Sequence, residues 1–176
     1  MRKGKAMFKK LMPDRIFESF KDITPEILNE YGIKALLLDI DNTLVTYDDP
    51  EPTKEVEDWL KSMRESGIKA AFVSNNSDPS RVERFNQDIG YFAVSRAKKP
   101  LPNGFKRALE HMGVDAKNAA SVGDQIFTDV WAAKNVGAYA FLVPPIKDKT
   151  TLFFRAKRLL ERQIIKSYRR AENKEK

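Results

Sequence analysis

Short runs of apolar residues alternate along the chain with longer segments in which apolar residues recur at helical spacing. This alternation is typical of a parallel β-sheet covered by α-helices, a Rossmann-like α/β fold. It predicts five strands, at Ala35–Ile40, Ala70–Ser74, Phe92–Val94, Ala119–Val122 and Ala138–Val143. It predicts four helices between them, at Thr53–Glu65, Pro79–Gln87, Asn103–Met112 and Asp129–Asn135.

Two further segments flank this body. Residues 7–31 hold too many large apolar side chains for a disordered tail, and residues 151–168 interleave an apolar stripe with Arg and Lys. We expect the second segment to form a basic amphipathic helix, whose apolar face packs on its own domain or, alternatively, docks on a membrane. The predicted organisation is one domain over residues 1–176. It has an N-terminal apolar and basic extension (1–31), a central body (32–148) and a C-terminal helix (149–176).

The charge of the chain changes this picture only at its ends. The chain has 176 residues, 41% of them apolar, and a net charge of +7. Residues 1–11 carry five basic side chains and no acid, and residues 151–176 carry nine basic and three acidic ones, which leaves −4 for the body. This asymmetry suggests ends that contact an anionic surface, with solvated tails as the alternative.

The composition excludes several kinds of site. Without cysteine the chain has neither disulfides nor thiolate metal ligands, and its single histidine, His111, excludes a multi-histidine metal site. The N-terminus has no apolar signal region, and no apolar run approaches the roughly 18 residues that a membrane span needs. We therefore expect a cytoplasmic protein, soluble or peripheral on the inner face of the membrane.

Polar residues follow several of the predicted strands directly. In a parallel sheet the residues after each strand converge at the carboxyl edge, where ligands bind. The residues expected to converge are Asp39, Asp41 and Thr43 after the first strand, Ser74 and Asn75 after the second, Lys99 after the third, and Asp124 and Asp129 after the fourth. The sequence therefore predicts a crevice with four carboxylates, hydroxyl groups and an ammonium group.

Such a cluster of acids is destabilised by mutual repulsion unless a cation lies among them. Oxygen ligands favour a hard ion, so we expect Mg²⁺. Of Asp39 and Asp41, one can act as a nucleophile on phosphorus and the other as a proton donor to the leaving oxygen. Mg²⁺ and Lys99 would neutralise the phosphoryl charge, and Ser74, Asn75 and nearby amides would bind its oxygens. This chemistry is phosphoryl transfer through an aspartyl phosphate.

The segments DIDNT, AFVSNN, KKPLP and GDQIFTD resemble, in order and spacing, the four motifs of the haloacid dehalogenase superfamily, here its subfamily IIIA. The resemblance implies that Asp39 is the nucleophile and Asp41 the general acid and base, that Ser74 binds phosphate, and that Lys99 stabilises the charged intermediate. It implies Mg²⁺ ligation by Asp39, the backbone carbonyl of Asp41, and Asp124, with Asp129 orienting the site. Lys98 is the rival of Lys99, and the superfamily's lysine commonly precedes a proline.

The gaps between the motifs leave no room for the cap domain that covers small substrates in many members of this superfamily. A capless site favours a phosphate carried on something large, such as a macromolecule or a lipid headgroup. Over about residues 11–165 the chain also looks like the bacterial YqeG-type phosphatases, which are similar to the mitochondrial phosphatidylglycerophosphate phosphatase. That likeness implies hydrolysis of phosphatidylglycerophosphate, and the basic ends fit an anionic bilayer.

Other functions stay open at this point. A phosphatase acting on a nucleic acid is the main rival, since basic tails also bind polynucleotides; a protein or a soluble sugar or nucleotide phosphate is a further alternative substrate. A receiver-type signalling domain has a similar set of residues, but its phosphorylated aspartate follows the third strand rather than the first. A non-catalytic binding module would be expected to lose Asp39 or Asp41, and both are present.

Overall fold

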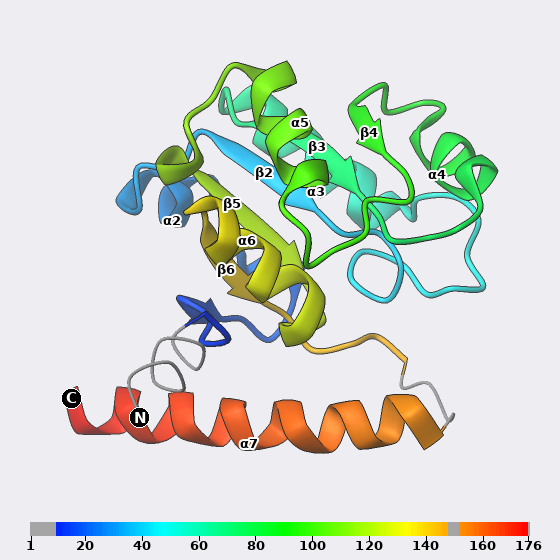
Figure 1. The fold of residues 1–176 in the computed structure, drawn as a ribbon. Helices are drawn as coiled ribbons and strands as arrows, with labels where there is room; N and C mark the ends of the chain where they lie inside the picture. The colour runs from blue at the N-terminus through cyan, green and yellow to red at the C-terminus, as the bar shows by residue number, and fades with distance from the viewer. Residues whose placement is uncertain (1–9, 148–151, 176) are drawn as a thin grey trace.

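The computed structural model describes residues 10–147 and 152–175 (Figure 1). Its six strands are parallel and form one sheet in the order β1-β6-β5-β2-β3-β4. The strands are β1 (Arg15–Ile16), β2 (Ala35–Leu38), β3 (Lys69–Val73), β4 (Phe92–Val94), β5 (Ala119–Gly123) and β6 (Tyr139–Leu142). The helices are α2 (Pro25–Glu30), α3 (Lys54–Glu65), α4 (Pro79–Asn86), α5 (Asn103–Met112), α6 (Trp131–Val136) and α7 (Leu152–Glu175). The short turns are η1 (Phe20–Asp22), η2 (Ala116–Asn118) and the π-helical η3 (Ile126–Val130).

The predicted α/β fold is confirmed, but the sheet has one strand more than predicted. The additional strand, β1, comes from the N-terminal segment and pairs with β6, with Ile16 opposite Leu142. A strand of two residues is too short to show an alternating hydrophobic pattern, so the sequence did not reveal it. Phe17 and Phe20 nearby are buried, which confirms that this segment packs on the body.

Alternate side chains of the central strand β2 enter two different cores, because successive side chains of a strand point to opposite faces. Leu36 and Leu38 pack with apolar residues of α2, α3 and α4, whereas Ala35 and Leu37 pack with those of α5, α6 and η3. All four side chains are buried. This double burial explains why β2 is an uninterrupted apolar run, as expected of a parallel strand covered on both faces.

The helix boundaries follow from capping side chains. Thr53 accepts a hydrogen bond from the Val56 amide at the start of α3, and Asp78 accepts one from the Ser80 amide at the start of α4. The predicted helix at Asp129–Asn135 is less accurate: the helical path begins at Ile126 with η3, and α6 continues it. Asp129 therefore lies inside a π-helical turn rather than at a helix start.

The predicted C-terminal helix is α7, which lies along one side of the molecule in Figure 1. Ile164 is buried in the core that contains Leu142, and the Tyr168 hydroxyl donates to the Asp14 carbonyl at 3.4 Å. The helix thus contacts the body through Ile164 and Tyr168, whereas Leu159 and Leu160 of its apolar stripe are 61% and 59% exposed. None of the helices in the described residues is both long and apolar enough for a membrane crossing.

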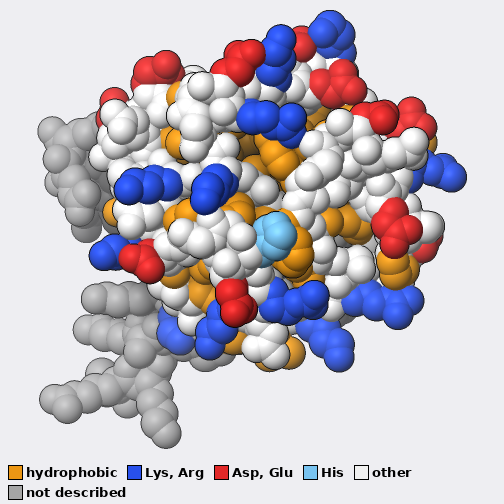
Figure 2. Space-filling model, turned by 90° about the horizontal axis from the view of Figure 1, so that it is seen from above, with side chains coloured by type: hydrophobic (Ala, Val, Ile, Leu, Met, Phe, Trp, Pro, Cys, Tyr) orange, Lys and Arg blue, Asp and Glu red, His pale blue; other side chains and the backbone are white. Residues whose placement is uncertain are grey.

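The face of the molecule seen in Figure 2 carries acidic and basic side chains in mixture, without a field of one sign. The single histidine, pale blue in that view, is exposed and has apolar side chains beside it. His111 stacks on Phe92 with 4.1 Å between ring centroids. The histidine therefore has a packing role at the end of α5.

Candidate active site

The predicted site residues meet at the carboxyl ends of the three central strands. Asp39 follows β2, Ser74 follows β3 and Asp124 follows β5. The chain passes from β2 to β3 on one side, while β5 pairs with the other side of β2, so the strand order reverses direction here. Such a reversal opens a crevice in α/β sheets, and a polar cavity of about 370 Å³ lies at this edge.

The loop after β2 is a tight turn that folds back on itself. The amide groups of Thr43, Leu44 and Val45 all approach the Ile40 carbonyl, at 3.0–3.3 Å. Asn42 adopts a φ of 68°, a left-handed conformation that asparagine tolerates better than most residues. Its side chain donates to Asp124 Oδ2 at 3.3 Å. Asn42 therefore links two strand ends, and only the DNT triplet in the sequence pointed to it.

Lys99 lies in the middle of the acidic cluster and is only 6% exposed. Its ammonium group contacts Asp39 Oδ1 at 2.7 Å and Asp129 Oδ1 at 2.6 Å. Burial alone would lower the pKa of Lys99, but these two carboxylates outweigh burial and raise it above its ordinary value. Lys99, rather than the exposed Lys98, is thus the lysine that the fold places among the acids.

The side chain of Asn75 holds the backbone of Lys99. Its amide donates to the Lys99 carbonyl at 3.0 Å, and its carbonyl accepts from the Lys99 amide at 2.7 Å. Ser74 is buried beside it and accepts a hydrogen bond from the Asn76 amide at 3.0 Å. The three predicted phosphate-binding residues, Ser74, Asn75 and Lys99, all line the cavity, and the Asn75 side chain is engaged in fixing the loop that carries Lys99.

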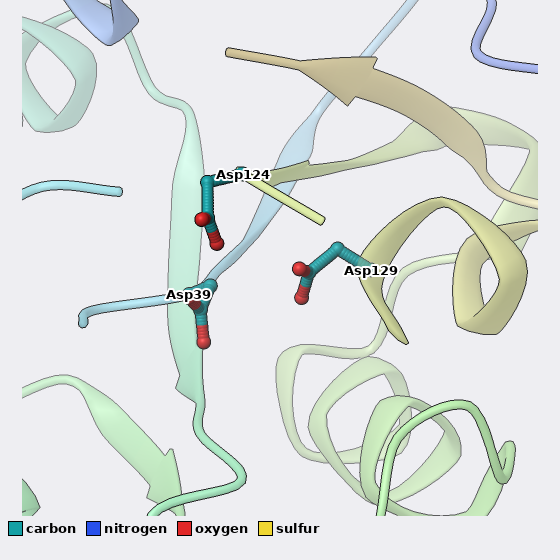
Figure 3. Close-up of side chains that lie close together, drawn as sticks. All are labelled: Asp39, Asp124 and Asp129. Carbon is teal, nitrogen blue, oxygen red and sulfur yellow. The ribbon is translucent and has the colours of Figure 1, made fainter. Parts of the chain in front are cut away.

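Three buried carboxylates, those of Asp39, Asp124 and Asp129, point toward one another with ligand atoms within 4.8 Å (Figure 3). Burial, followed by the charge of Asp129, raises the pKa of Asp124 to about 6. Burial and the two neighbouring acids raise the pKa of Asp39 to about 7, although Lys99 opposes them. This repulsion, with oxygen as the donor atom throughout, fits a hard divalent cation.

Asp129 reaches this position because Gly123 leaves room for it. A Cβ atom at residue 123 would lie 2.3 Å from Asp129 Cγ, a distance that real Cβ atoms do not show. The other oxygen of Asp129 accepts from the Thr128 hydroxyl at 3.0 Å and the Gln125 amide at 3.3 Å. At the end of β5, Gly123 is therefore required by packing, and Asp124 after it adds a carboxylate to the cluster.

Asp41 has its own set of partners. The Asn76 side-chain Nδ2 donates to its Oδ2 at 2.8 Å, and Arg81 Nη2 lies 3.1 Å from its Oδ1, an ion pair without hydrogen-bond geometry. Arg81 also donates to the Pro50 carbonyl at 2.8 Å and so holds the loop beside the cavity. Arg81 was not predicted as a partner of Asp41, because it lies in α4, far along the chain from Asp41.

Thr43 supports the carboxylate of Asp39. Its hydroxyl donates to Asp39 Oδ2 at 3.1 Å, while Lys99 contacts Oδ1, so both carboxylate oxygens are fixed. Tyr47, at the wall of the cavity, was not predicted; its burial, together with the nearby acids, raises the pKa of its hydroxyl. Every predicted residue thus lies in or beside the cluster.

The site is open to the surface, as predicted for a capless protein. Only a loop joins β2 to α3, and only α4 lies between β3 and β4. Within the described ranges, 10–147 and 152–175, no inserted domain covers the carboxyl edge. One element from outside the body does reach the site: Arg158 of α7 pairs with the Asp124 carboxylate.

Comparisons with known proteins agree with this geometry. A family model of haloacid dehalogenase-like hydrolases matches residues 28–137. The chain is 35% identical over 165 residues to the probable phosphatase YqeG of Bacillus subtilis, across 93% of this chain and 95% of that protein. It is 52% identical over 86 residues to the glyceraldehyde 3-phosphate phosphatase of Pyrococcus abyssi, across 44% of this chain and 36% of that protein.

Two solved structures share the fold. A phosphatase of this superfamily from Thermococcus onnurineus superposes with a TM-score of 0.56 at 19% identity, across 68% of this chain and 90% of that chain. The cobalt-bound deoxy-D-mannose-octulosonate 8-phosphate phosphatase of Haemophilus influenzae superposes with a TM-score of 0.51 at 15% identity, across 78% and 90%. At these identities the likeness concerns the fold alone.

Proposed function

The chain belongs to the haloacid dehalogenase-like hydrolase family and is a YqeG-like phosphatase, and from this premise we propose a Mg²⁺-dependent phosphomonoesterase that forms an aspartyl phosphate on Asp39. The observation that carries the mechanism is the Lys99 ammonium group between Asp39 and Asp129, at 2.7 and 2.6 Å. Membership in a family of enzymes removes the receiver-type and binding-module alternatives.

In the proposed first step, a carboxylate oxygen of Asp39 attacks phosphorus and the bond from phosphorus to the leaving oxygen breaks. Asp41 donates a proton to that oxygen, so the product leaves as a neutral alcohol. In the second step Asp41 takes a proton from water, whose oxygen attacks phosphorus and releases inorganic phosphate with the free Asp39 carboxylate. Thr43 and Lys99 hold Asp39 for both steps, and Arg81 and Asn76 hold Asp41.

Mg²⁺, held by Asp39, Asp124 and the Asp41 backbone carbonyl, would supply positive charge to the phosphoryl oxygens. Asp129 would orient these metal-binding groups by holding the Lys99 ammonium group, which contacts Asp39. Ser74 and the amides next to it would donate to the phosphoryl oxygens that face β3. The Asn75 side chain contributes indirectly, through its two hydrogen bonds to Lys99.

As substrate we propose phosphatidylglycerophosphate. The cavity wall is formed largely by polar side chains, so it fits a phosphorylated headgroup whose acyl chains stay in the bilayer. Nearby on α7, Leu159 and Leu160 are exposed among basic residues, which suits peripheral contact with an anionic membrane. The local likeness to the archaeal glyceraldehyde 3-phosphate phosphatase favours a second candidate, a small soluble phosphate ester.

The test is phosphate release from phosphatidylglycerophosphate in mixed micelles with Mg²⁺, beside soluble sugar, triose and nucleotide phosphates and a 5′-phosphorylated oligonucleotide. We expect turnover of the lipid well above that of the other substrates, and none with Asp39→Asn. Preference for triose phosphate would favour the second candidate, and preference for the oligonucleotide would favour a nucleic-acid phosphatase. Full activity of Asp39→Asn would refute the mechanism itself.

A further inference from the structure

Helix α7 carries a pair of charged residues that reaches the acidic cluster from outside the region that the family model covers. The match to the family model ends at residue 137, and α7 begins at Leu152. Glu161 of this helix is only 2% exposed, an unusual position for a carboxylate unless it is paired. Arg158, one turn earlier, is its partner at 2.9 Å.

Arg158 binds the main chain and the side chain of one residue at the same time. Its Nη1 donates to the Asp124 carbonyl at 2.6 Å, and its Nη2 pairs with the Asp124 carboxylate. A planar guanidinium group that contacts both groups restricts the backbone and the side chain of Asp124 together. Asp124 is the proposed metal ligand at the end of β5.

Glu161 acts on the segment that follows. Its Oε1 accepts from the Ile126 amide at 2.9 Å, at the first residue of η3. The same turn carries Asp129, which contacts Lys99. The two ends of the stretch from Asp124 to η3 are therefore fixed by one ion pair from α7.

We infer that Arg158 and Glu161 are positioning residues for the metal-binding carboxylates, so that α7 is part of the active site rather than an appendage. A buried ion pair is weak evidence for added stability, because desolvation of both charges offsets their attraction. The Arg158–Glu161 ion pair contacts Asp124 and the start of η3, so its role is to fix the position of these groups rather than to add stability. The inference rests on the proposed metal-dependent function and adds a residue pair to it.

A simpler role for Arg158 makes the opposite prediction. If the guanidinium group served only as a counter-charge, its removal would make the cluster more negative and tighten cation binding. If it positions Asp124, its removal weakens cation binding even though the cluster becomes more negative. Partners outside the metal coordination shell typically change metal affinity by about 10–100-fold when removed.

The experiment is a titration of the full-length, metal-free protein with Mn²⁺, followed by electron paramagnetic resonance without substrate. Positioning predicts that Arg158→Met and the charge-conserving Arg158→Lys both weaken Mn²⁺ binding about tenfold, since lysine cannot contact two groups in the same way. Arg162→Met, an exposed arginine on the same helix, serves as the matched control and should bind Mn²⁺ as the wild type does. Unchanged affinity in Arg158→Lys, or tighter binding in Arg158→Met, would overturn the inference.

A second variant is needed as a check on misfolding, because Arg158→Met leaves the buried Glu161 carboxylate without its ion pair to residue 158. The double variant Arg158→Met/Glu161→Gln removes both charges, and the glutamine carbonyl still accepts from the Ile126 amide. We expect it to keep its fold and still bind Mn²⁺ about tenfold more weakly than the wild type. Wild-type affinity in this variant would also count against the inference.

Amide hydrogen exchange over residues 124–130 tests the positioning role of Arg158 and Glu161 separately from the proposed metal-dependent phosphatase mechanism. Positioning predicts faster exchange there in Arg158→Lys and in the double variant than in the wild type, whether or not metal is present. Unchanged exchange rejects the positioning role and leaves the phosphatase mechanism intact. If the wild type bound no Mn²⁺ and kept its activity in EDTA, the metal dependence would be wrong, while exchange would still decide the role of α7.

Discussion

Asp39 and Asp124 follow neighbouring strands and share one acidic cluster, yet different parts of the chain hold them. The two supports of Asp39 come from within the body: Thr43, four residues later, and Lys99. Asp124 is contacted by Arg158, which lies 34 residues later on α7. The proposed nucleophile is thus held by groups within the common fold, whereas the proposed metal ligand also depends on an element added after it.

This difference separates two ways of building a site. Thr43 is fixed by the same short turn that places Asp39, so that support requires no distant packing. The contact of Arg158 requires α7 to dock, which depends on Ile164 in the core and on the Tyr168 contact with Asp14. Perturbing α7 should therefore affect the Asp124 side of the cluster before it affects Asp39.

The largest effect is expected from Lys99→Met, which removes the support of Asp39 inside the body. Without the ammonium group, Asp39 and Asp129 repel each other and the phosphoryl charge loses a stabilising cation. We expect kcat for phosphate release to fall on the order of 10³-fold. Lys98→Met, the exposed neighbour, is the control and should keep its kcat; a similar loss in both variants would contradict the assignment of Lys99.

The pH dependence of stability in EDTA compares the two carboxylates directly. Their pKa values in the fold, about 7 for Asp39 and about 6 for Asp124, exceed the ordinary value of 3.8. A raised carboxyl pKa means that the folded state binds more protons than the unfolded state, so stability is present at low pH and is lost as the pH rises through the folded pKa.

Asp39→Asn and Asp124→Asn remove this loss, so each variant should gain stability over the wild type as the pH rises from about 4 to about 7. The gain for Asp39 has an upper bound of about 4 kcal/mol, from about 1.4 kcal/mol per pKa unit. The gain for Asp124 should be smaller, because its pKa of about 6 is raised less than that of Asp39. Urea unfolding at several pH values measures both, and a wild type more stable than Asp39→Asn at about pH 8 would contradict the prediction.

Most of the fold and the body side of the site can be predicted from the sequence, for a physical reason. A buried parallel strand is a recognisable apolar run, so the polar residues at its end, such as Asp39, Ser74 and Asp124, are placed by the strand itself. Strand β1 has two residues and no period, and it was missed. The contacts of Arg81 and Arg158 also could not be predicted, because helical spacing identifies a polar face without showing what that face contacts.

Gly123→Ala tests the position of Asp129, the third carboxylate of the cluster. Asp129 contacts Lys99 and lies in η3, the turn whose first residue is bound by Glu161 of α7. In an unchanged backbone the added Cβ would lie 2.3 Å from Asp129 Cγ, so either the Asp129 carboxylate or the end of β5 must be displaced. A misplacement of about 1 Å in a catalytic group can lower the rate by about 10²-fold, and we expect a loss of kcat of that order. Gly67→Ala is the control: its φ of +76° strains alanine, but no atom lies within 4 Å.

That control should lose stability in urea, by about 1 kcal/mol, and keep its kcat. If Gly67→Ala lost as much activity as Gly123→Ala, the effect would reflect general destabilisation rather than the position of Asp129. If Gly123→Ala kept full activity, Asp129 would not need its present position, and the role of η3 in the site would have to be abandoned.

The smallest effect on chemistry is expected from the outer face of α7. Leu159 and Leu160 are exposed, so Leu159→Ser/Leu160→Ser should leave Arg158 and Glu161 in place and change the turnover of soluble esters little. The same double variant should bind vesicles of an anionic phospholipid about thirtyfold more weakly, since partial burial of the two leucines in a bilayer contributes about 1 kcal/mol each. Leu101→Ser, at a leucine that is 54% exposed before α5, is the control for general loss of surface hydrophobicity.

Equal vesicle binding by the wild type, the α7 double variant and Leu101→Ser would remove α7 as the membrane contact. A large loss of ester turnover in the α7 variant alone would instead show that its outer face, as well as its ion pair, supports Asp124.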